Sequence, residues 1–246
     1  MSKNVLITGA VQGIGRSIAR KFAEHGYGVV INYRNPDKEK EAQEFAEECS
    51  RISGTDCICL QADVSDPEKC RWIVEETVNR FGSLDVLVNN AGVMKYSLLQ
   101  NLKDDDYRKI VSSNQDSVFF MMKYAAKYMI KKKNGSIINM ASVAGIYGSS
   151  TLSVYSATKA AVISMTKVAA TELAYKKVRV NAVAPGMVNT QMTNSIPQEG
   201  KESMCRNIPM RRFAEPNEVA NAVYWLASDE ASYVTGEILE VSGGLK

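Results

Sequence analysis

The sequence predicts an α/β fold in which a doubly wound parallel sheet of seven strands is covered by helices on both faces. The first observation is that short β-rich runs alternate with longer amphipathic runs along the whole chain. The second is its size, because 246 residues with 45% hydrophobic content suit one domain with a substantial core. No repeat, low-complexity tract or linker divides the chain. We therefore expect residues 1–246 to form a single domain.

Seven β-rich runs are the expected strands, and the first of them stops at a glycine. In chain order they are NVLITG (4–9), YGVVINY (27–33), DCICLQADV (56–64), LDVLVNNAG (84–92), SIINMAS (136–142), VRVNAVAPG (178–186) and EILEVSGG (237–244). Ligands of such folds bind beyond the carboxyl ends of the strands, so the loops from strand to helix are expected to form the site.

Five longer runs are the expected helices, at 13–26, 36–52, 66–82, about 104–131 and about 152–175. In the first, Ile14, Ile18 and Phe22 have helical spacing. Asp66 is the expected cap of the third helix, with Pro67 in its first turn. The alternation of these helices with the strands is what predicts a parallel sheet.

The composition excludes several classes of function. The 30 basic and 27 acidic residues leave a formal charge of +3, which gives no reason to expect nucleic acid or a membrane surface as a partner. No run approaches the roughly 18 apolar residues of a membrane span, and the first residues do not resemble a signal peptide. Five cysteines without a paired framework and a single histidine, His25, indicate reduced thiols and no metal site. We therefore expect a cytoplasmic protein.

Three glycines follow the first predicted strand at the start of a helix: Gly9, Gly13 and Gly15 in TGAVQGIG. A tight turn needs glycine, a pyrophosphate close to the backbone leaves no room for a Cβ atom, and a helix N-terminus supplies free N–H groups. A simple tight turn between strand and helix is the alternative. Their place after the first strand of an alternating chain favours dinucleotide binding.

The end of the second predicted strand indicates which dinucleotide is bound. NAD sites usually place an Asp or Glu about 20 residues beyond the glycines, where it binds the ribose 2′-hydroxyl. The run INYRNPD has no acid before Asp37, and the Arg34 guanidinium could bind a 2′-phosphate. We therefore predict a preference for NADP(H), with NAD(H) as the second choice. Arg34 as a solvated loop cation is the alternative.

A tyrosine and a lysine lie one helical turn apart in VYSATKA, at Tyr155 and Lys159. A free phenol titrates near pH 10, and a neighbouring ammonium favours the phenolate, so we predict that Lys159 lowers the pKa of Tyr155 toward neutrality. Most such pairs are incidental helix neighbours. What favours a catalytic pair here is Ser142, at the end of a predicted strand, which could hold a carbonyl oxygen while Tyr155 protonates it.

With these motifs the sequence resembles the short-chain dehydrogenases/reductases, from residue 3 to residue 244. The residues that match the family's pattern are Thr8, Gly9, Gly13, Gly15, Asp63, Val64, Asn89, Asn90, Ala91, Gly92, Asn114, Ser142, Tyr155, Lys159, Pro185, Gly186 and Thr190. The resemblance implies a Rossmann fold, a nicotinamide cofactor and an oxidoreductase activity.

The resemblance also implies the roles of the catalytic residues. Tyr155 is the expected general acid/base, and Ser142 is expected to hold the substrate carbonyl. Lys159 would lower the pKa of the tyrosine and bind the nicotinamide ribose. Asn114 is expected at a helix irregularity, where it would hold a water that relays protons through Lys159.

The same resemblance places further residues around the cofactor. Asp63 would bind the adenine amino group, and Thr190 with the Val188 backbone would hold the nicotinamide carboxamide. The full expected set is Thr8, Gly9, Gly13, Ile14, Gly15, Arg34, Asp63, Val64, Asn90, Ala91, Gly92, Tyr155, Lys159, Pro185, Gly186, Val188 and Thr190. Taken singly, Asp63 could instead end its strand, Asn90 could bond within a turn and Thr190 could begin a helix.

A long segment at about 186–213 is expected to be an irregular, mobile substrate lid. It carries Met187, Met192, Met204 and Met210, and methionine tolerates varied apolar shapes, although a lid that packs on its own core would look the same. With ASDEASYVTGEILEV farther on, the segment resembles the 3-oxoacyl-(acyl carrier protein) reductases. That resemblance implies an NADPH-dependent reductase of 3-oxoacyl thioesters in fatty acid synthesis.

An acyl carrier protein is acidic, so basic residues near the cleft would be its docking site. The candidates are Lys131, Lys132, Lys133, Lys176, Lys177, Arg211 and Arg212. A solvated helix end is the alternative for the basic run, because lysines there also suit the helix dipole.

Two other functions remain open from the sequence. One is a sugar or polyol dehydrogenase, since VVINYRN also resembles the glucose dehydrogenase branch. The other is a nucleotide-sensing or scaffold protein without chemistry, which would be expected to lack a catalytic group. The helix at 152–175 is rich in small residues that permit close helix contact, although packing on its own sheet would ask for the same. Family members usually pair this helix and the one near 104–131 across a dimer and then form tetramers, so we expect a homotetramer.

Overall fold

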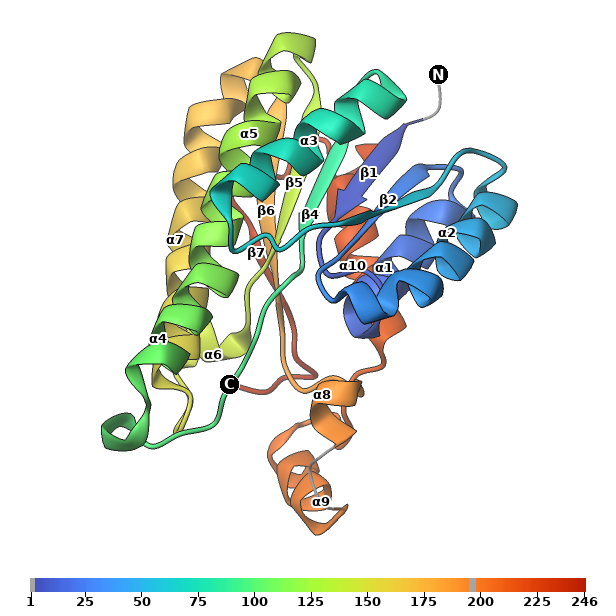
Figure 1. Ribbon diagram of the computed structural model, residues 1–246. Coiled ribbons are helices and arrows are strands. Elements are labelled where there is room, and N and C mark those ends of the chain that lie inside the picture. Colours follow the sequence, from blue (N-terminus) through green and yellow to red (C-terminus); the bar gives the residue numbers. More distant parts are fainter. Residues whose placement is uncertain (1–2, 195–197) are drawn as a thin grey trace.

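The computed structural model describes residues 3–194 and 198–246, and within them seven parallel strands form one sheet. The strands lie in the order β3-β2-β1-β4-β5-β6-β7 (Figure 1), which confirms the predicted doubly wound sheet. The bounds are β1 Asn4–Ile7, β2 Gly28–Tyr33, β3 Ile58–Gln61, β4 Val86–Asn89, β5 Gly135–Met140, β6 Val178–Pro185 and β7 Ile238–Val241. The order reverses between β1 and β4, and such a reversal leaves a crevice at the carboxyl ends of the strands.

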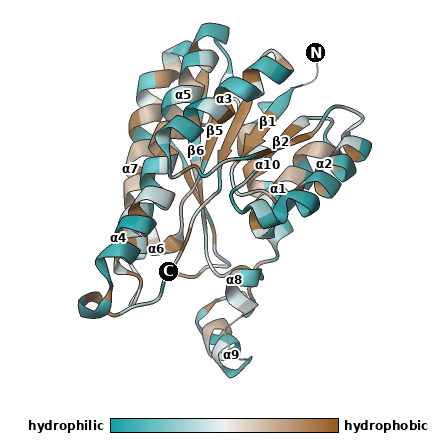
Figure 2. Cartoon of the chain, in the orientation of Figure 1, coloured by the Kyte–Doolittle hydropathy of each residue, from teal (hydrophilic) through white to brown (hydrophobic). Residues whose placement is uncertain are grey.

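Helices cover both faces of this sheet. α1 (Gly13–Glu24), α2 (Glu39–Ser53) and α10 (Pro216–Ala227) pack on one face, and α3 (Pro67–Phe81), α5 (Ser117–Lys132) and α7 (Ser153–Leu173) pack on the other. Figure 2 shows brown strands between helices whose outer surfaces are largely teal or white. Because both faces are buried, the strands are continuous hydrophobic runs and not alternating ones. Across the described ranges, the helices lack the combination of length and apolar character that crossing a membrane requires.

The predicted cap of α3 is present. The Asp66 carboxylate accepts a hydrogen bond from the Glu68 N–H at 2.8 Å, and Pro67 begins the helix. Gly82 ends the helix with a φ of 73°, a left-handed conformation that glycine adopts without steric cost. Local sequence therefore determines both ends of α3.

The long helix expected at 104–131 is interrupted. α4 covers Asp104–Val111, a π-helical turn (η3) covers Ser112–Asp116, and α5 follows directly. Asn114 lies fully buried in the π-helical turn, at the irregularity that the family resemblance implied. Such turns are rare and often occur at functional sites.

The second half of the chain contains one helix that was not predicted and one segment that was predicted wrongly. The expected helices do not include α10, although Pro216 and a capping box between Glu215 and Glu218 mark its start. The segment at 186–213 is not irregular throughout, because it contains α8 (Gln191–Asn194) and α9 (Gln198–Asn207). Residues 195–197 of the expected lid lie outside the described residues. The remaining short elements are α6 (Val143–Tyr147) and the turns η1 (Pro36–Lys38), η2 (Leu99–Asn101), η4 (Ala174–Lys176) and η5 (Asp229–Ala231).

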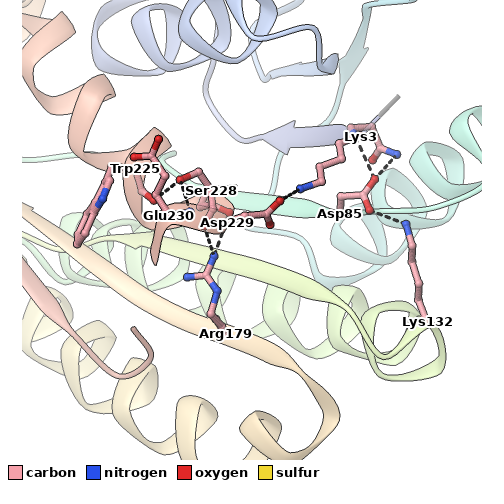
Figure 3. A network of polar contacts seen from close by, with 10 residues as sticks. Lys3, Asp85, Lys132, Arg179, Trp225, Ser228, Asp229 and Glu230 are labelled. Carbon is pink, nitrogen blue, oxygen red and sulfur yellow. Dashed lines mark hydrogen bonds and ion pairs between the residues drawn. The ribbon is translucent and has the colours of Figure 1, made fainter. Parts of the chain in front are cut away.

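Ion pairs lie at the edge of the sheet formed by the amino-terminal ends of the strands. Lys3 pairs with Asp229 at 2.7 Å, and the buried Asp85 pairs with Lys132 (Figure 3). Arg179 donates hydrogen bonds to main-chain carbonyls at the end of α10. These contacts stabilise the edge opposite the carboxyl ends of the strands.

Candidate active site

A cavity of about 670 Å³ opens beyond the carboxyl ends of the strands. The predicted site residues that line it are Gly9, Gly13, Ile14, Gly15, Arg34, Asp63, Val64, Asn90, Ala91, Gly92, Ser142, Tyr155, Lys159, Pro185, Gly186, Val188 and Thr190. Thr8 and Asn114 are buried and do not line the cavity. The fold thus brings motifs from the whole length of the chain to one wall.

Two residues of the glycine loop have the left-handed backbone conformation that glycine adopts readily. Gly9 and Gly13 have φ values of 63° and 57°. Gly15 needs no such conformation, but a Cβ atom there would lie 2.4 Å from the Gly9 carbonyl oxygen and 2.6 Å from Asn90 Nδ2. The third glycine therefore lets the loop pack tightly on Asn90. The first turn of α1, which lines the cavity, has N–H groups without intrahelical partners.

Thr8 and Asn90 join the loops that follow β1 and β4. The Thr8 hydroxyl accepts hydrogen bonds from the N–H groups of Asn90 and Ala91, both at 2.9 Å. Asn90 Nδ2 donates in return to the carbonyls of Thr8 and Gly9, at 2.9 and 3.0 Å. Thr8 does not line the cavity itself but holds in place two residues that do. The side chain of Asn90 bonds to the loop that follows β1 and not within its own turn.

Asn32 is a site residue that the sequence analysis missed. It lies in β2 with 2% of its surface exposed, and it contributes to the wall. Its Oδ1 accepts a hydrogen bond from the Gly9 N–H at 3.3 Å, and its Nδ2 donates to the carbonyls of Leu60 and Ala62 at 3.2 and 3.0 Å. The amide within the apolar run VVINY was the available signal, because a buried amide requires specific partners.

The side chains that line the cavity carry a surplus of positive charge. Arg34 is exposed there, and its main-chain carbonyl accepts a hydrogen bond from Gln61 Nε2 at 2.8 Å. Asp63 accepts hydrogen bonds from the N–H and the hydroxyl of Ser65, at 3.0 and 2.8 Å. Asp63 is the one carboxylate among the described residues of the wall, whose cationic side chains are Arg34, Lys38, Lys159 and Lys246. This balance favours a polyanionic ligand.

Ser142, Tyr155 and Lys159 lie in the same cavity beside the carboxyl end of β5. Ser142 caps the short helix α6, and its hydroxyl accepts a hydrogen bond from the Ala144 N–H at 3.2 Å. Tyr155 and Lys159 are one turn apart on α7, with Lys159 Nζ 5.7 Å from the centre of the Tyr155 ring. Lys159 is 4% exposed and donates a hydrogen bond to the Met140 carbonyl at 2.7 Å.

The prediction that Lys159 lowers the pKa of Tyr155 toward neutrality is wrong for this structure. Burial raises the pKa of the Tyr155 phenol above its usual value, and a hydrogen bond with Ser142 opposes that shift only in part. Burial also lowers the pKa of Lys159 to about 8. Both shifts have one cause, because the removal of water disfavours the charged form of an acid and of a base alike. The phenol is therefore protonated at neutral pH.

Asn114 supports the wall beside Lys159. Its Oδ1 accepts a hydrogen bond from the Val93 N–H at 2.7 Å, and its Nδ2 donates to the Val93 carbonyl at 2.8 Å. A Cβ atom on Gly92 would lie 3.2 Å from Asn114 Oδ1 and 3.7 Å from Lys159 Nζ. Gly92 therefore lies close to both side chains and leaves space beside the ammonium.

The segment after β6 packs against the glycine loop. A Cβ atom on Gly13 would lie 3.7 Å from Thr190 Cγ2. The Thr190 N–H donates a hydrogen bond to the Thr193 hydroxyl, which donates to the Val188 carbonyl, both at 3.0 Å. Thr190 therefore precedes α8, as the alternative interpretation allows, and also contributes to the cavity wall.

Two tyrosines of the wall carry no sequence motif and were also missed. Tyr96 and Tyr147 are 51% and 46% exposed. The Tyr147 hydroxyl donates a hydrogen bond to Glu240 of β7 at 3.0 Å, and that contact raises the pKa of the phenol. Both tyrosines are therefore side chains that a substrate in the cavity could contact.

Five of the seven basic residues predicted to dock a carrier protein lie far from the cavity. Lysines 131–133 end α5 directly before β5, and Lys132 pairs with Asp85 at the amino-terminal edge of the sheet (Figure 3). Lysines 176 and 177 directly precede β6. Residues before a parallel strand lie at the edge opposite the residues that follow it, so these lysines do not form a patch at the cavity. Arg211 and Arg212 belong to the segment after β6.

The chain is similar over its whole length to known proteins. Residues 9–246 match the family model described as Enoyl-(Acyl carrier protein) reductase. The chain is 43% identical over 245 residues to the 3-oxoacyl-(acyl-carrier-protein) reductase FabG of Staphylococcus aureus, covering 100% of this chain and 98% of that protein. It is 42% identical over 247 residues to the FabG of Thermotoga maritima, covering 99% and 97%.

A solved structure described as ElxO with NADP bound has the same fold. The two chains are 37% identical with a TM-score of 0.92, and the match covers 99% of this chain and 98% of that one. In this chain the glycine loop, Ser142, Tyr155 and Lys159 all line one cavity. The chain belongs to the short-chain dehydrogenase/reductase family of NAD(P)-dependent oxidoreductases.

Proposed function

We propose that this protein is an NADPH-dependent 3-oxoacyl-(acyl carrier protein) reductase of fatty acid synthesis. The observation that carries the proposal is that Ser142, Tyr155 and Lys159 line the same cavity as the glycine loop. A ketone bound at Ser142 and Tyr155 would therefore lie beside a dinucleotide held by that loop. The full-length relatives named as such reductases support the substrate class.

The residues of the wall suit a nicotinamide dinucleotide with a 2′-phosphate. The N-terminus of α1, with the turn at Gly9 and Gly13, would bind the pyrophosphate. Asp63 would bind the adenine amino group. Arg34 and Lys38 would bind the 2′-phosphate, and within the described residues of the wall no carboxylate follows β2 to repel it. The NADP of the related solved structure supports this choice.

The reaction we propose adds one hydride and one proton across the ketone. When bound, the reduced nicotinamide supplies the hydride for the carbonyl carbon. Tyr155 donates its phenolic proton to the carbonyl oxygen, and Ser142 donates a hydrogen bond to the same oxygen. A phenol with a raised pKa is protonated at neutral pH, which is the state that reduction requires. The product is a 3-hydroxyacyl thioester.

Lys159 would restore the proton that Tyr155 loses. A pKa of about 8 makes the release of a proton from this ammonium easier than from an ordinary lysine. The ammonium would also bind the nicotinamide ribose. Asn114 would hold a water that passes protons toward Lys159. Thr190 and the Val188 backbone would hold the nicotinamide carboxamide.

We also propose that the segment at about 186–213 closes over the substrate. Met187 and Gln191 line the cavity, and Met210 is 61% exposed. α9 has no buried residue, and in Figure 1 it lies beyond the carboxyl ends of the strands, away from the sheet. A helix that buries little can move at small cost. A carrier protein would approach on this side. Of the seven basic residues expected to dock it, Arg211 and Arg212 are the two that belong to this segment.

Reduction of an enoyl thioester is a second candidate, because the matching family model is described by that activity. The two hydroxyl groups at the site favour ketone reduction instead. Ser142 and Tyr155 can both donate to one carbonyl oxygen, whereas reduction of a carbon–carbon double bond delivers its proton to carbon.

The test is the rate of NADPH oxidation by the purified protein with acetoacetyl and crotonyl thioesters of a carrier protein. Oxidation of glucose with NADP⁺ is measured in parallel. We expect turnover of the acetoacetyl thioester and less of the other two. Absence of acetoacetyl turnover would overturn the proposal, and glucose oxidation in its place would indicate a sugar dehydrogenase.

We further propose a cytoplasmic homotetramer built from pairs of α4, α5 and α7. Exposed apolar side chains on these helices support a contact with a second copy: Tyr107 is 53% exposed, Phe119 48% and Val168 55%. Light scattering should give the mass of four chains. A monomeric mass would contradict the assembly but would leave the active-site proposal intact.

A further inference from the structure

Tyr96 has a hydroxyl group that the protein itself does not use. The residue lies in the loop after β4, lines the cavity and is half exposed. Within the described part of the chain its hydroxyl makes no hydrogen bond, whereas the hydroxyl of the other missed tyrosine, Tyr147, is held by Glu240 at 3.0 Å. Tyr96 therefore retains a hydrogen-bond donor for a ligand.

The loop that carries Tyr96 is anchored on both sides of the residue. Lys95 forms an ion pair with Asp106 of α4 at 2.7 Å. The Ser97 N–H donates a hydrogen bond to the Thr151 carbonyl at 2.8 Å. That second contact joins the loop to the connection between α6 and α7. Tyr96 is thus held in place relative to the elements that carry Ser142 and Tyr155, as a specificity contact requires.

Tyr96 and the catalytic Tyr155 line the same cavity and interact with each other. Burial is the main cause of the raised pKa of Tyr155, and repulsion from the ionised form of Tyr96 raises it further. A substrate group bound at Tyr155 therefore has the Tyr96 hydroxyl in its neighbourhood.

We infer that Tyr96 determines specificity by donating a hydrogen bond to the second carbonyl of a 3-oxoacyl substrate, the carbonyl of the thioester. The inference rests on the proposed function. One carbon separates the two carbonyl groups of such a substrate, so Ser142 and Tyr155 can serve the ketone while a separate donor serves the thioester. A carbonyl oxygen only accepts hydrogen bonds, and a phenol in this position can supply one. A site that bonds a substrate group discriminates against analogues without that group.

The test compares wild type with Tyr96→Phe on two substrates. One is S-acetoacetyl-N-acetylcysteamine, and the other is the monoketone in which a methylene replaces the thioester carbonyl. Loss of one hydrogen bond between neutral groups should lower kcat/KM for the first substrate about three- to tenfold. The monoketone should react at an unchanged rate. Equal losses on both substrates, or no loss on the first, would overturn the inference.

Two controls separate this result from other failures. Tyr175→Phe changes a tyrosine that is 76% exposed and does not line the cavity, and it should leave both rates unchanged. If wild type fails with the acetoacetyl thioester but reduces a 3-oxo ester, the proposed function is wrong. The ratio between the 3-oxo ester and its monoketone then tests Tyr96 alone. A protein that reduces no ketone overturns both proposals.

Discussion

The Lys159 ammonium lies 5.7 Å from the centre of the Tyr155 ring and donates its hydrogen bond to strand β5, at the Met140 carbonyl. The lysine is therefore anchored to the sheet, and the shift in the Tyr155 pKa is caused by burial, Ser142 and Tyr96. Burial acts on both groups, and it leaves the phenol protonated and makes the ammonium more acidic than an ordinary lysine. This arrangement suits a site that gives a proton to its substrate and then takes one from solvent.

Tyr155→Phe should lower kcat for ketone reduction by about 100- to 10,000-fold, because it removes the proton donor. Binding of NADPH, measured by fluorescence titration, should be retained. Tyr233→Phe is a matched control, since that side chain is fully exposed and does not line the cavity. Full activity of the Tyr155 variant would mean that the proton comes from another group.

Lys159 should make the stability of the protein rise with pH. Its pKa is about 8 in the folded protein and 10.5 for the free side chain, so the unfolded chain binds more protons between these values. The cost of the buried charge is therefore complete below pH 8 and disappears as the pH rises toward 10.5. The free energy of unfolding of wild type, relative to Lys159→Met, should increase by roughly 1 to 3 kcal/mol between about pH 8 and pH 10.

Denaturant titrations at several pH values measure this difference. Titration of the other tyrosines and cysteines is common to both proteins and cancels. Lys167→Met changes an exposed lysine of the same helix, so its difference from wild type should not vary with pH. A constant difference for Lys159→Met as well would contradict the shifted pKa.

Gly15→Ala should weaken NADPH binding and lower stability by about 1 to 3 kcal/mol, because the new Cβ atom would overlap the Gly9 carbonyl and the Asn90 amide. Gly82→Ala provides the comparison. Its Cβ atom would meet nothing within 4 Å, although its φ of 73° makes the backbone strained. That variant should lose stability but bind NADPH with unchanged Kd. Unchanged NADPH binding in Gly15→Ala would show that the glycine loop does not hold the cofactor.

Arg34→Ala should lower kcat/KM for NADPH about ten- to a hundredfold and leave the value for NADH nearly unchanged, since a charged hydrogen bond to the 2′-phosphate is lost. Arg51→Ala, at an exposed position near the end of α2, controls for the change in net charge. An equal loss with both nucleotides would assign Arg34 a structural role.

Some of the site was predictable because the signal is local. Asp66 caps its helix through the N–H two residues ahead, and Gly9 and Gly13 adopt left-handed turns within a few residues of the strand they follow. The family resemblance added residues whose spacing alone is weak evidence, and the structure places nearly all of them on one cavity wall. Asn32 was missed although an amide within an apolar run was a signal, because its role depends on partners in distant segments of the chain.

The sequence by itself determined the alternation of strands and helices, the glycine loop and the spacing of Tyr155 and Lys159, since these depend on neighbours within a turn or two, and the family resemblance added Ser142. Only the tertiary structure decided that the pKa of Tyr155 is raised and that lysines 131–133 lie away from the cavity. Burial and electrostatic fields sum over groups that are distant in the chain. Which edge of the sheet a residue occupies likewise depends on the direction of the whole strand. Neither the pKa shift nor the position at the sheet can therefore be read from a local sequence pattern.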